Sequence, residues 1–157
     1  MEPSFAKLLA ELADHHVRFI VVGGVAVTLH GYVRLTEDVD ILVDPGAENI
    51  ARFLGCMAGF GEGFARELSV DDFDDAEGAI RIVETTEQIQ LDVFTRMSGL
   101  HYSDVITDAD RLQLGTRVIR YASKASLIRW KEVSVREKDR LDAMALRKLT
   151  ANPQAFD

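Results

Sequence analysis

The chain has 157 residues, of which 47% are hydrophobic and 28% charged, and its 18 basic and 26 acidic side chains give a formal net charge of −8. A chain of this size can bury a core without a disulfide or a metal, and its acidity argues against a protein that coats nucleic acid by charge alone. The single cysteine, Cys56, allows no internal disulfide, and no apolar run is long enough to span a bilayer, so we expect a cytoplasmic protein without a membrane partner.

The first half of the chain predicts helices and strands in alternation. In chain order they are a helix over residues 4–14, a strand over 17–22, a short helix over 25–30, a strand over 38–43 and a helix over 47–58. The first helix follows from apolar residues spaced three and four apart. The strands follow from short β-branched runs, which are ended by Gly23-Gly24 and by Asp44-Pro45-Gly46.

The second half predicts a β-hairpin of residues 80–83 and 89–94, weaker strands over 105–106 and 117–121, and a helical stretch over 123–149 with a break near 133–136. Asp108 and Asp110 are expected to cap a turn into a helix, and the acidic stretch 71–75 to be a mobile, solvated loop. This order predicts an α/β (α+β) fold in which helices flank a mixed β-sheet. We expect one domain over 1–157, with a core over about 1–122 and a helical C-terminal segment over about 123–150.

Two aspartates alternate in the predicted strand over 38–43. The side-chain period of two places Asp38 and Asp40 on one face, while Val39 and Ile41 point into the core. Neighbouring carboxylates are costly unless a cation neutralises them, and Mg²⁺ accepts hard carboxylate oxygens while keeping positions for water and phosphate. The pattern therefore predicts a divalent-cation site.

The residues around this pair supply complementary groups. Gly23 and Gly24 lack Cβ atoms, so backbone N–H groups can approach a phosphate at the positive end of the helix that follows. Asp92, inside the strand over 89–94, is the candidate for a third carboxylate in a two-metal site. These positions would bring a nucleoside triphosphate and its metal ions together.

The order of these motifs resembles small bacterial members of the nucleotidyltransferase superfamily related to DNA polymerase beta. The shared features, over about residues 17–94, are a GG pair, the segment R-x-T-x-D-x-D and a lone aspartate on a later strand. The resemblance implies a nucleotidyltransferase-like mixed sheet and a Mg²⁺ or Mn²⁺ cofactor. It also implies that Asp38, Asp40 and Asp92 are the catalytic, metal-binding carboxylates, and that Asp92 assists the attacking hydroxyl.

Nucleotide binding is implied for a second group of residues. Gly23 and Gly24 match the phosphate-loop glycines, although many superfamily members carry GS and so add a serine hydroxyl that is absent here. Arg34 and Thr36 match residues with supporting roles. The segment K…R-x-K-D-x-x-D over 131–142 resembles the signature of abortive-infection type nucleotidyltransferases, toxin-like enzymes of toxin–antitoxin pairs, which implies that Lys131 contacts the nucleotide.

These patterns predict a metal-dependent nucleotidyltransferase that moves a nucleoside monophosphate from an NTP to an acceptor hydroxyl and releases pyrophosphate. A protein, an RNA and a small molecule all remain open as acceptors, and the resemblance implies a cognate antitoxin or toxin protein as partner. The alternative is a module of a toxin–antitoxin pair that binds a nucleotide or a partner without turnover. Such a module should tolerate Asn at one of the three aspartates. A transferase that modifies a small cationic molecule is a third hypothesis, because an acidic pocket suits a cation.

Overall fold

The computed structural model describes residues 3–31, 38–61, 67–84, 88–132 and 144–148. Its elements are α1 (Pro3–Asp14), β1 (Phe19–Val22), α2 (Gly23–Leu29), β2 (Val39–Val43), α3 (Ala47–Ala58), the 3₁₀ turn η2 (Val70–Asp72), β3 (Ala79–Glu84), β4 (Ile89–Phe94), α4 (Tyr102–Val105), the 3₁₀ turn η3 (Ile106–Asp108), β5 (Asp110–Leu114), β6 (Arg117–Tyr121) and α5 (Lys124–Glu132). Residues 144–148 are also helical. None of the described helices is both long enough and apolar enough to cross a bilayer.

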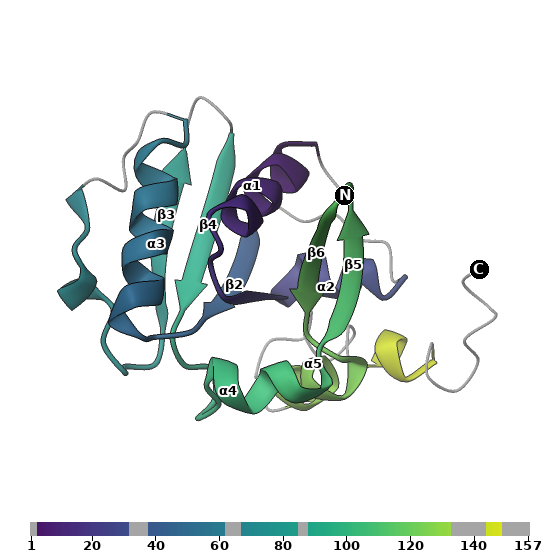
Figure 1. Cartoon of the computed structure of the whole chain (residues 1–157). Helices are drawn as coiled ribbons and strands as arrows, with labels where there is room; N and C mark the ends of the chain where they lie inside the picture. The colour runs from purple at the N-terminus through teal and green to yellow at the C-terminus, as the bar shows by residue number, and fades with distance from the viewer. Residues whose placement is uncertain (1–2, 32–37, 62–66, 85–87, 133–143, 149–157) are drawn as a thin grey trace.

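The described strands form one mixed sheet in the order β3-β4-β2-β1-β6-β5. Helices α1 and α3 cover one face of this sheet and α2 lies on the other, while α4 and α5 lie toward one end of the strands (Figure 1). Neighbouring strands are antiparallel in β1–β2, β3–β4 and β5–β6, and parallel in β2–β4 and β1–β6. The predicted α/β fold, a mixed sheet flanked by helices, is therefore confirmed.

The core lies between the sheet and its helices. All four residues of β1 are buried, as expected for a central strand that is covered on both faces. Helix α1 buries Phe5, Leu8, Leu9 and Leu12, at the helical spacing that the sequence shows. Helix α3 buries a matching stripe that includes Phe53.

The register of the central strands sets up the candidate site. On one side of β2, Asp40 pairs with Val22 of β1; on the other side it pairs with Asp92 of β4. On the far side of β4, Asp92 pairs with Arg81 of the edge strand β3. Residues from four strands therefore form one row across the sheet.

Two predictions for the second half of the chain are wrong. Residues 105–106 are not a strand, because a capping box between His101 and Asp104 starts the helical turn α4, which η3 then follows. Asp110 begins strand β5 instead of capping a turn into a helix. The carboxylate of Asp108 accepts a hydrogen bond from the Ser123 hydroxyl, 3.0 Å away, at the start of α5.

The four aspartates of the acidic stretch 71–75 are exposed, as expected for a solvated loop, and the first two of them belong to the 3₁₀ turn η2. Asp72 closes a capping box with Ser69, whose backbone N–H donates to Asp72 Oδ2 at 2.7 Å. Asp75 contacts the ring of His101, which lies 26 residues further along the chain. Local backbone donors and one distant side chain therefore contact this loop.

The C-terminal helical prediction agrees with α5 and with residues 144–148, where Leu146 is fully buried. The expected break near 133–136 lies outside the described residues.

Candidate functional site

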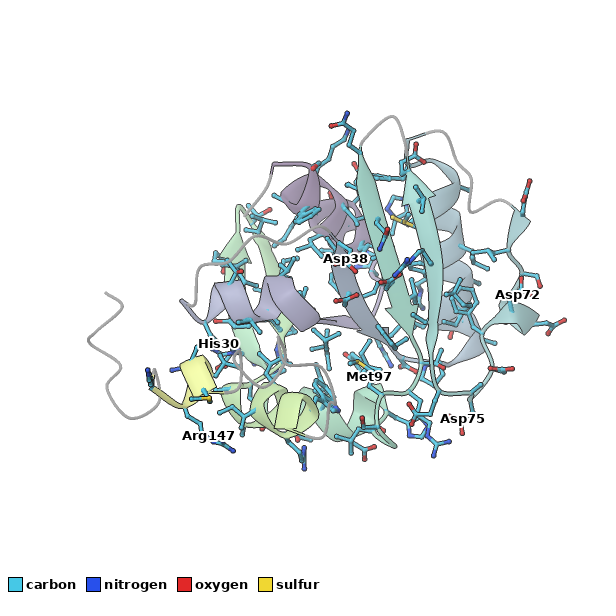
Figure 2. All side chains as sticks on the ribbon, turned by 180° about the vertical axis from the view of Figure 1, so that it is seen from behind. His30, Asp38, Asp72, Asp75, Met97 and Arg147 are labelled. Atoms are coloured by element: carbon cyan, nitrogen blue, oxygen red, sulfur yellow. The ribbon has the colours of Figure 1, made fainter. Side chains whose placement is uncertain are left out.

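The three aspartates that the sequence indicates lie together on the sheet. Asp38 directly precedes β2, Asp40 is the second residue of that strand, and Asp92 is its neighbour on β4. One carboxylate oxygen from each of the three lies within 4.8 Å of the others. Figure 2 shows Asp38 over the sheet face that carries α2. The structure thus brings the three predicted metal ligands to one point.

Strand alternation explains why the carboxylates share this face. Val39 and Ile41 are fully buried toward the opposite face, whereas Asp40 is half-buried. The same alternation in β4 buries Leu91 beside Asp92. Because each carboxylate is tied to the sheet through a short side chain, the distances among them follow from the strand register.

The backbone of α2 presses against this cluster. Gly23 is the first residue of α2, two residues earlier than predicted, and its φ of +64° lies in the left-handed region that favours glycine. A Cβ atom at Gly23 would lie 2.8 Å from Asp40 Cγ, and closer still to Asp40 Oδ2. Gly23 is therefore needed to leave room for a carboxylate, a reason that the sequence alone did not give.

Among the residues that the structure describes, the basic side chain of Arg81 contacts the cluster. Arg81 Nε donates to Asp92 Oδ1 at 2.9 Å, and Arg81 Nη2 donates to Asp92 Oδ2 at 3.3 Å. The side chain of Asp92 is 8% exposed, whereas that of Arg81 is 60% exposed. A two-point contact from an arginine thus lies between the buried carboxylate and solvent.

The carboxyls of the cluster have opposite electrostatic environments. Burial raises the pKa of Asp38, and its hydrogen bond with the Asp92 carboxyl raises that pKa further. Burial also acts to raise the pKa of Asp92, but hydrogen bonds with Arg81 and Asp38 outweigh it, so the Asp92 pKa is lower than usual. Without a bound cation, Asp38 is therefore the carboxyl of this pair that holds a proton more readily.

The donor set fits a divalent cation. It consists of three hard carboxylate oxygens, the ligand type that Mg²⁺ and Mn²⁺ take in proteins. Ligand oxygens on opposite sides of a Mg²⁺ ion are about 4 Å apart, so oxygens within 4.8 Å of one another need only small side-chain movements to share an ion. The cluster could hold such an ion, and its geometry does not choose between the two metals.

Other predicted nucleotide-binding residues are placed less completely. Gly24 lies half-buried in α2, where its carbonyl accepts a hydrogen bond from the Thr28 hydroxyl at 3.1 Å. Arg34 and Thr36 lie outside the described residues. Lys131 belongs to α5, but its side chain is not described, and the rest of the C-terminal signature, over 133–142, also lies outside the described residues.

Sequence reasoning missed Arg81. The signal was present in the hairpin, because strands that end at Glu84 and begin at Ile89 place Arg81 opposite Asp92. The hairpin was predicted, but its register was not worked out, and an arginine in an edge strand attracts little attention by itself.

Comparisons with known proteins support the fold. No family model matches the sequence, and no curated protein matches it significantly. Among solved structures, the chain is similar to the crystal structure of an antigenic nucleotidyltransferase-like protein from Paracoccidioides brasiliensis. The TM-score is 0.52 at 17% sequence identity, and the match covers 92% of this chain and 73% of that one. The chain therefore has a nucleotidyltransferase-like fold.

Proposed function

We propose that the protein is a metal-dependent nucleotidyltransferase that transfers a nucleoside monophosphate from an NTP to an acceptor hydroxyl. In this reaction the acceptor oxygen bonds to the α-phosphorus, the bond from that phosphorus to the α,β-bridging oxygen breaks, and pyrophosphate leaves. The hydroxyl proton passes to a carboxylate of the site. Atoms and charge balance without any further reactant.

The observation that carries this proposal is the convergence of Asp38, Asp40 and Asp92 on a nucleotidyltransferase-like fold. Three carboxylates held this close by strand register repel one another, and a divalent cation relieves that repulsion. A protein that only bound a partner would have no physical need for this arrangement in its sheet.

Each group has a distinct role in the proposed reaction. Asp38, Asp40 and Asp92 would together hold the cation, which supplies charge neutralisation for the triphosphate when bound. Asp92, whose pKa is lowered, stays ionised and so able to bind the cation. Because it comes from the neighbouring strand β4, we assign it the additional role of orienting the acceptor hydroxyl and receiving its proton. Gly23 keeps the backbone of α2 close to Asp40, and we propose that the predicted phosphate contact of Gly23 and Gly24 is made there.

Transfer of label tests the proposal. The purified chain would be incubated with each α-labelled NTP, Mg²⁺ or Mn²⁺ and a cell extract, beside the double variant Asp38→Asn/Asp40→Asn. We expect labelled product with the wild-type chain and none with the variant, and the labelled molecule identifies the acceptor class. The variant Glu67→Gln/Asp71→Asn removes the same charge from exposed positions and should transfer label normally.

Absence of transfer, together with absence of metal-dependent NTP binding, would contradict the enzyme proposal. It would favour the alternative, a module of a toxin–antitoxin pair that acts through contact alone. The toxin–antitoxin part rests on the resemblance of residues 131–142 and has its own test. Expression of the wild-type chain should slow growth of a host that lacks a cognate antitoxin, whereas Asp38→Asn/Asp40→Asn should not.

A further inference from the structure

The cluster includes a residue to which the proposed reaction gives no role. Arg81 lies on the edge strand β3, directly opposite Asp92 in the antiparallel register. Its two hydrogen bonds, of 2.9 and 3.3 Å, reach both oxygens of one carboxylate. The planar guanidinium therefore restricts rotation of the carboxylate plane, which a single hydrogen bond would leave free.

Arg81 is itself held in place from β4. Gln90 precedes Asp92 by two residues and so lies on the same face of the strand. With its amide oriented to satisfy both groups, the Gln90 side-chain oxygen accepts from Arg81 Nη2 at 3.2 Å. Asp92 and Gln90 of strand β4 thus both accept hydrogen bonds from the Arg81 guanidinium. These bonds favour one conformer of Arg81, although most of its side chain is exposed.

The orientation of Asp92 matters more than that of a typical surface acid. Asp38 and Asp40 come from one stretch of chain, so their relative position is fixed locally. Asp92 comes from β4, and its carboxylate must meet the other two across the strand boundary. Hydrogen-bonding partners that orient metal ligands typically affect metal affinity or activity by about 10- to 100-fold when they are removed.

We propose that Arg81 is a positioning residue, which holds the Asp92 carboxylate in the orientation that completes a divalent-cation site with Asp38 and Asp40. The proposal rests on the proposed function for the presence of that cation. It makes a claim that the proposed function does not, because the reaction proposed above gives roles to the three acids and the two glycines and none to Arg81.

A competing role for Arg81 predicts the opposite change in metal affinity when the arginine is removed. If Arg81 were merely a counter-charge for the three acids, its removal would leave a more negative cluster and metal would bind more tightly. Because Arg81 is 60% exposed, solvent screens its charge, so the loss of orientation should outweigh the loss of repulsion. The sign of the change in metal affinity therefore separates the two roles.

The experiment is a titration of the protein with Mn²⁺ in the absence of nucleotide, in which calorimetry measures the binding affinity. We expect Arg81→Met to weaken Mn²⁺ binding by about 10- to 100-fold. Arg81→Lys keeps the charge but cannot form the two-point contact, and it should also bind weakly. Guanidinium ion at millimolar concentration should restore part of the affinity of Arg81→Met but none of that of Asp92→Asn. Arg111→Met, on the exposed opposite edge strand β5, is the matched control and should bind like wild type.

Wild-type or tighter Mn²⁺ binding by Arg81→Met would overturn the proposal, as would full affinity in Arg81→Lys. If the wild-type chain binds Mn²⁺ but transfers no label from any NTP, the proposed function fails while the role of Arg81 is still decided by the titration. If the wild-type chain binds no Mn²⁺, both fail together. Far-ultraviolet circular dichroism of each variant confirms that the comparison is made between folded proteins.

Discussion

Two groups of aspartates in this chain stand in contrasting surroundings. The strand cluster, Asp38, Asp40 and Asp92, holds three carboxylates within 4.8 Å of one another. The loop cluster consists of neighbours in the sequence, yet its members do not converge. They are Asp71, Asp72, Asp74 and Asp75. Figure 2 shows Asp38 over the sheet and Asp72 and Asp75 at its outer side.

The difference lies in what fixes each carboxylate. In the loop, Asp72 accepts from the backbone of Ser69, Asp74 accepts from the backbone of Ala76, and Asp75 contacts His101. Each of these three acids contacts a partner of its own. In the strands, the register brings the three carboxylates together even though Asp92 also accepts from Arg81, so like charges lie close to one another. Closeness imposed by the backbone, and not the number of acids in a row, therefore points to a cation site.

The largest expected effect is metal-dependent stabilisation of the strand cluster. At a free Mn²⁺ concentration 100 times the dissociation constant, the free energy of unfolding of the wild-type chain should rise by about 2.7 kcal/mol. Asp40→Asn should lose most of that gain, because it removes one of the converging ligands, whereas Asp71→Asn should keep it. Urea denaturation with Mn²⁺ and with EDTA measures the difference. Equal stabilisation of both variants would remove the distinction between the clusters.

The glycine beside the strand cluster gives the next largest effect. Gly23→Ala adds a methyl group that meets the Asp40 carboxylate in a left-handed backbone, and it should lower the free energy of unfolding by about 2–3 kcal/mol. Gly115→Ala is the matched control, since φ is +66° there and the new atom has a 3.6 Å contact with Arg117. It should cost about 1 kcal/mol. Urea midpoints give both values, and equal losses would mean that the contact with Asp40 has no cost.

A smaller effect is an increase, and not a decrease, in the free energy of unfolding, and we expect it for a substitution at Asp38. Asp38→Asn removes one negative charge from the strand cluster and keeps the size of the side chain. In EDTA at pH 7 it should raise the free energy of unfolding by about 1 kcal/mol, at the expense of metal binding, because binding sites often hold groups that destabilise the fold. The same substitution at exposed Asp71 should change stability by less than about 0.5 kcal/mol. A destabilised Asp38→Asn would show that the acids support one another through hydrogen bonds more than they repel.

The sequence allowed much of the fold to be predicted, because the signals were local. Helix α3 and strand β4 begin and end where periodicity and turn residues place them. Strand β5 was missed because Asp110, Arg111 and Gln113 give it the polar look of a turn. It forms through pairing with β6 across a tight turn at Gly115, and a single-strand pattern does not reveal that pairing.

In the candidate site, too, the features that depend on one strand were predictable and those that depend on pairing between strands were not. That Asp38 and Asp40 share a face follows from alternation along one strand. That Asp92 joins them depends on β4 lying next to β2, and the sequence indicated this through resemblance to a family and not through periodicity. The contacts of Gly23 and Arg81 depend on the register between strands, which is set by tertiary packing. Side-chain contacts between neighbouring strands were therefore the part of the site that the sequence pattern could not predict.

The smallest effect concerns the loop cluster and depends on pH. A hydrogen bond with the His101 ring, helped by the charges of His101 and Arg96, lowers the pKa of Asp75 from its ordinary value of 3.8. A carboxyl whose pKa is lowered on folding adds stability above its unfolded pKa and loses it as the pH falls through the folded pKa. Asp75→Asn should therefore lower the urea midpoint slightly at pH 6 and much less at pH 2.5, with Asp71→Asn as control. Asp38 of the strand cluster should respond in the opposite direction, because its pKa is raised and acid relieves its repulsion, whereas the pKa of Asp92 is lowered like that of Asp75. An Asp75→Asn difference that persists at pH 2.5 would instead mean that residue 75 acts through packing, and that electrostatics does not distinguish the two clusters.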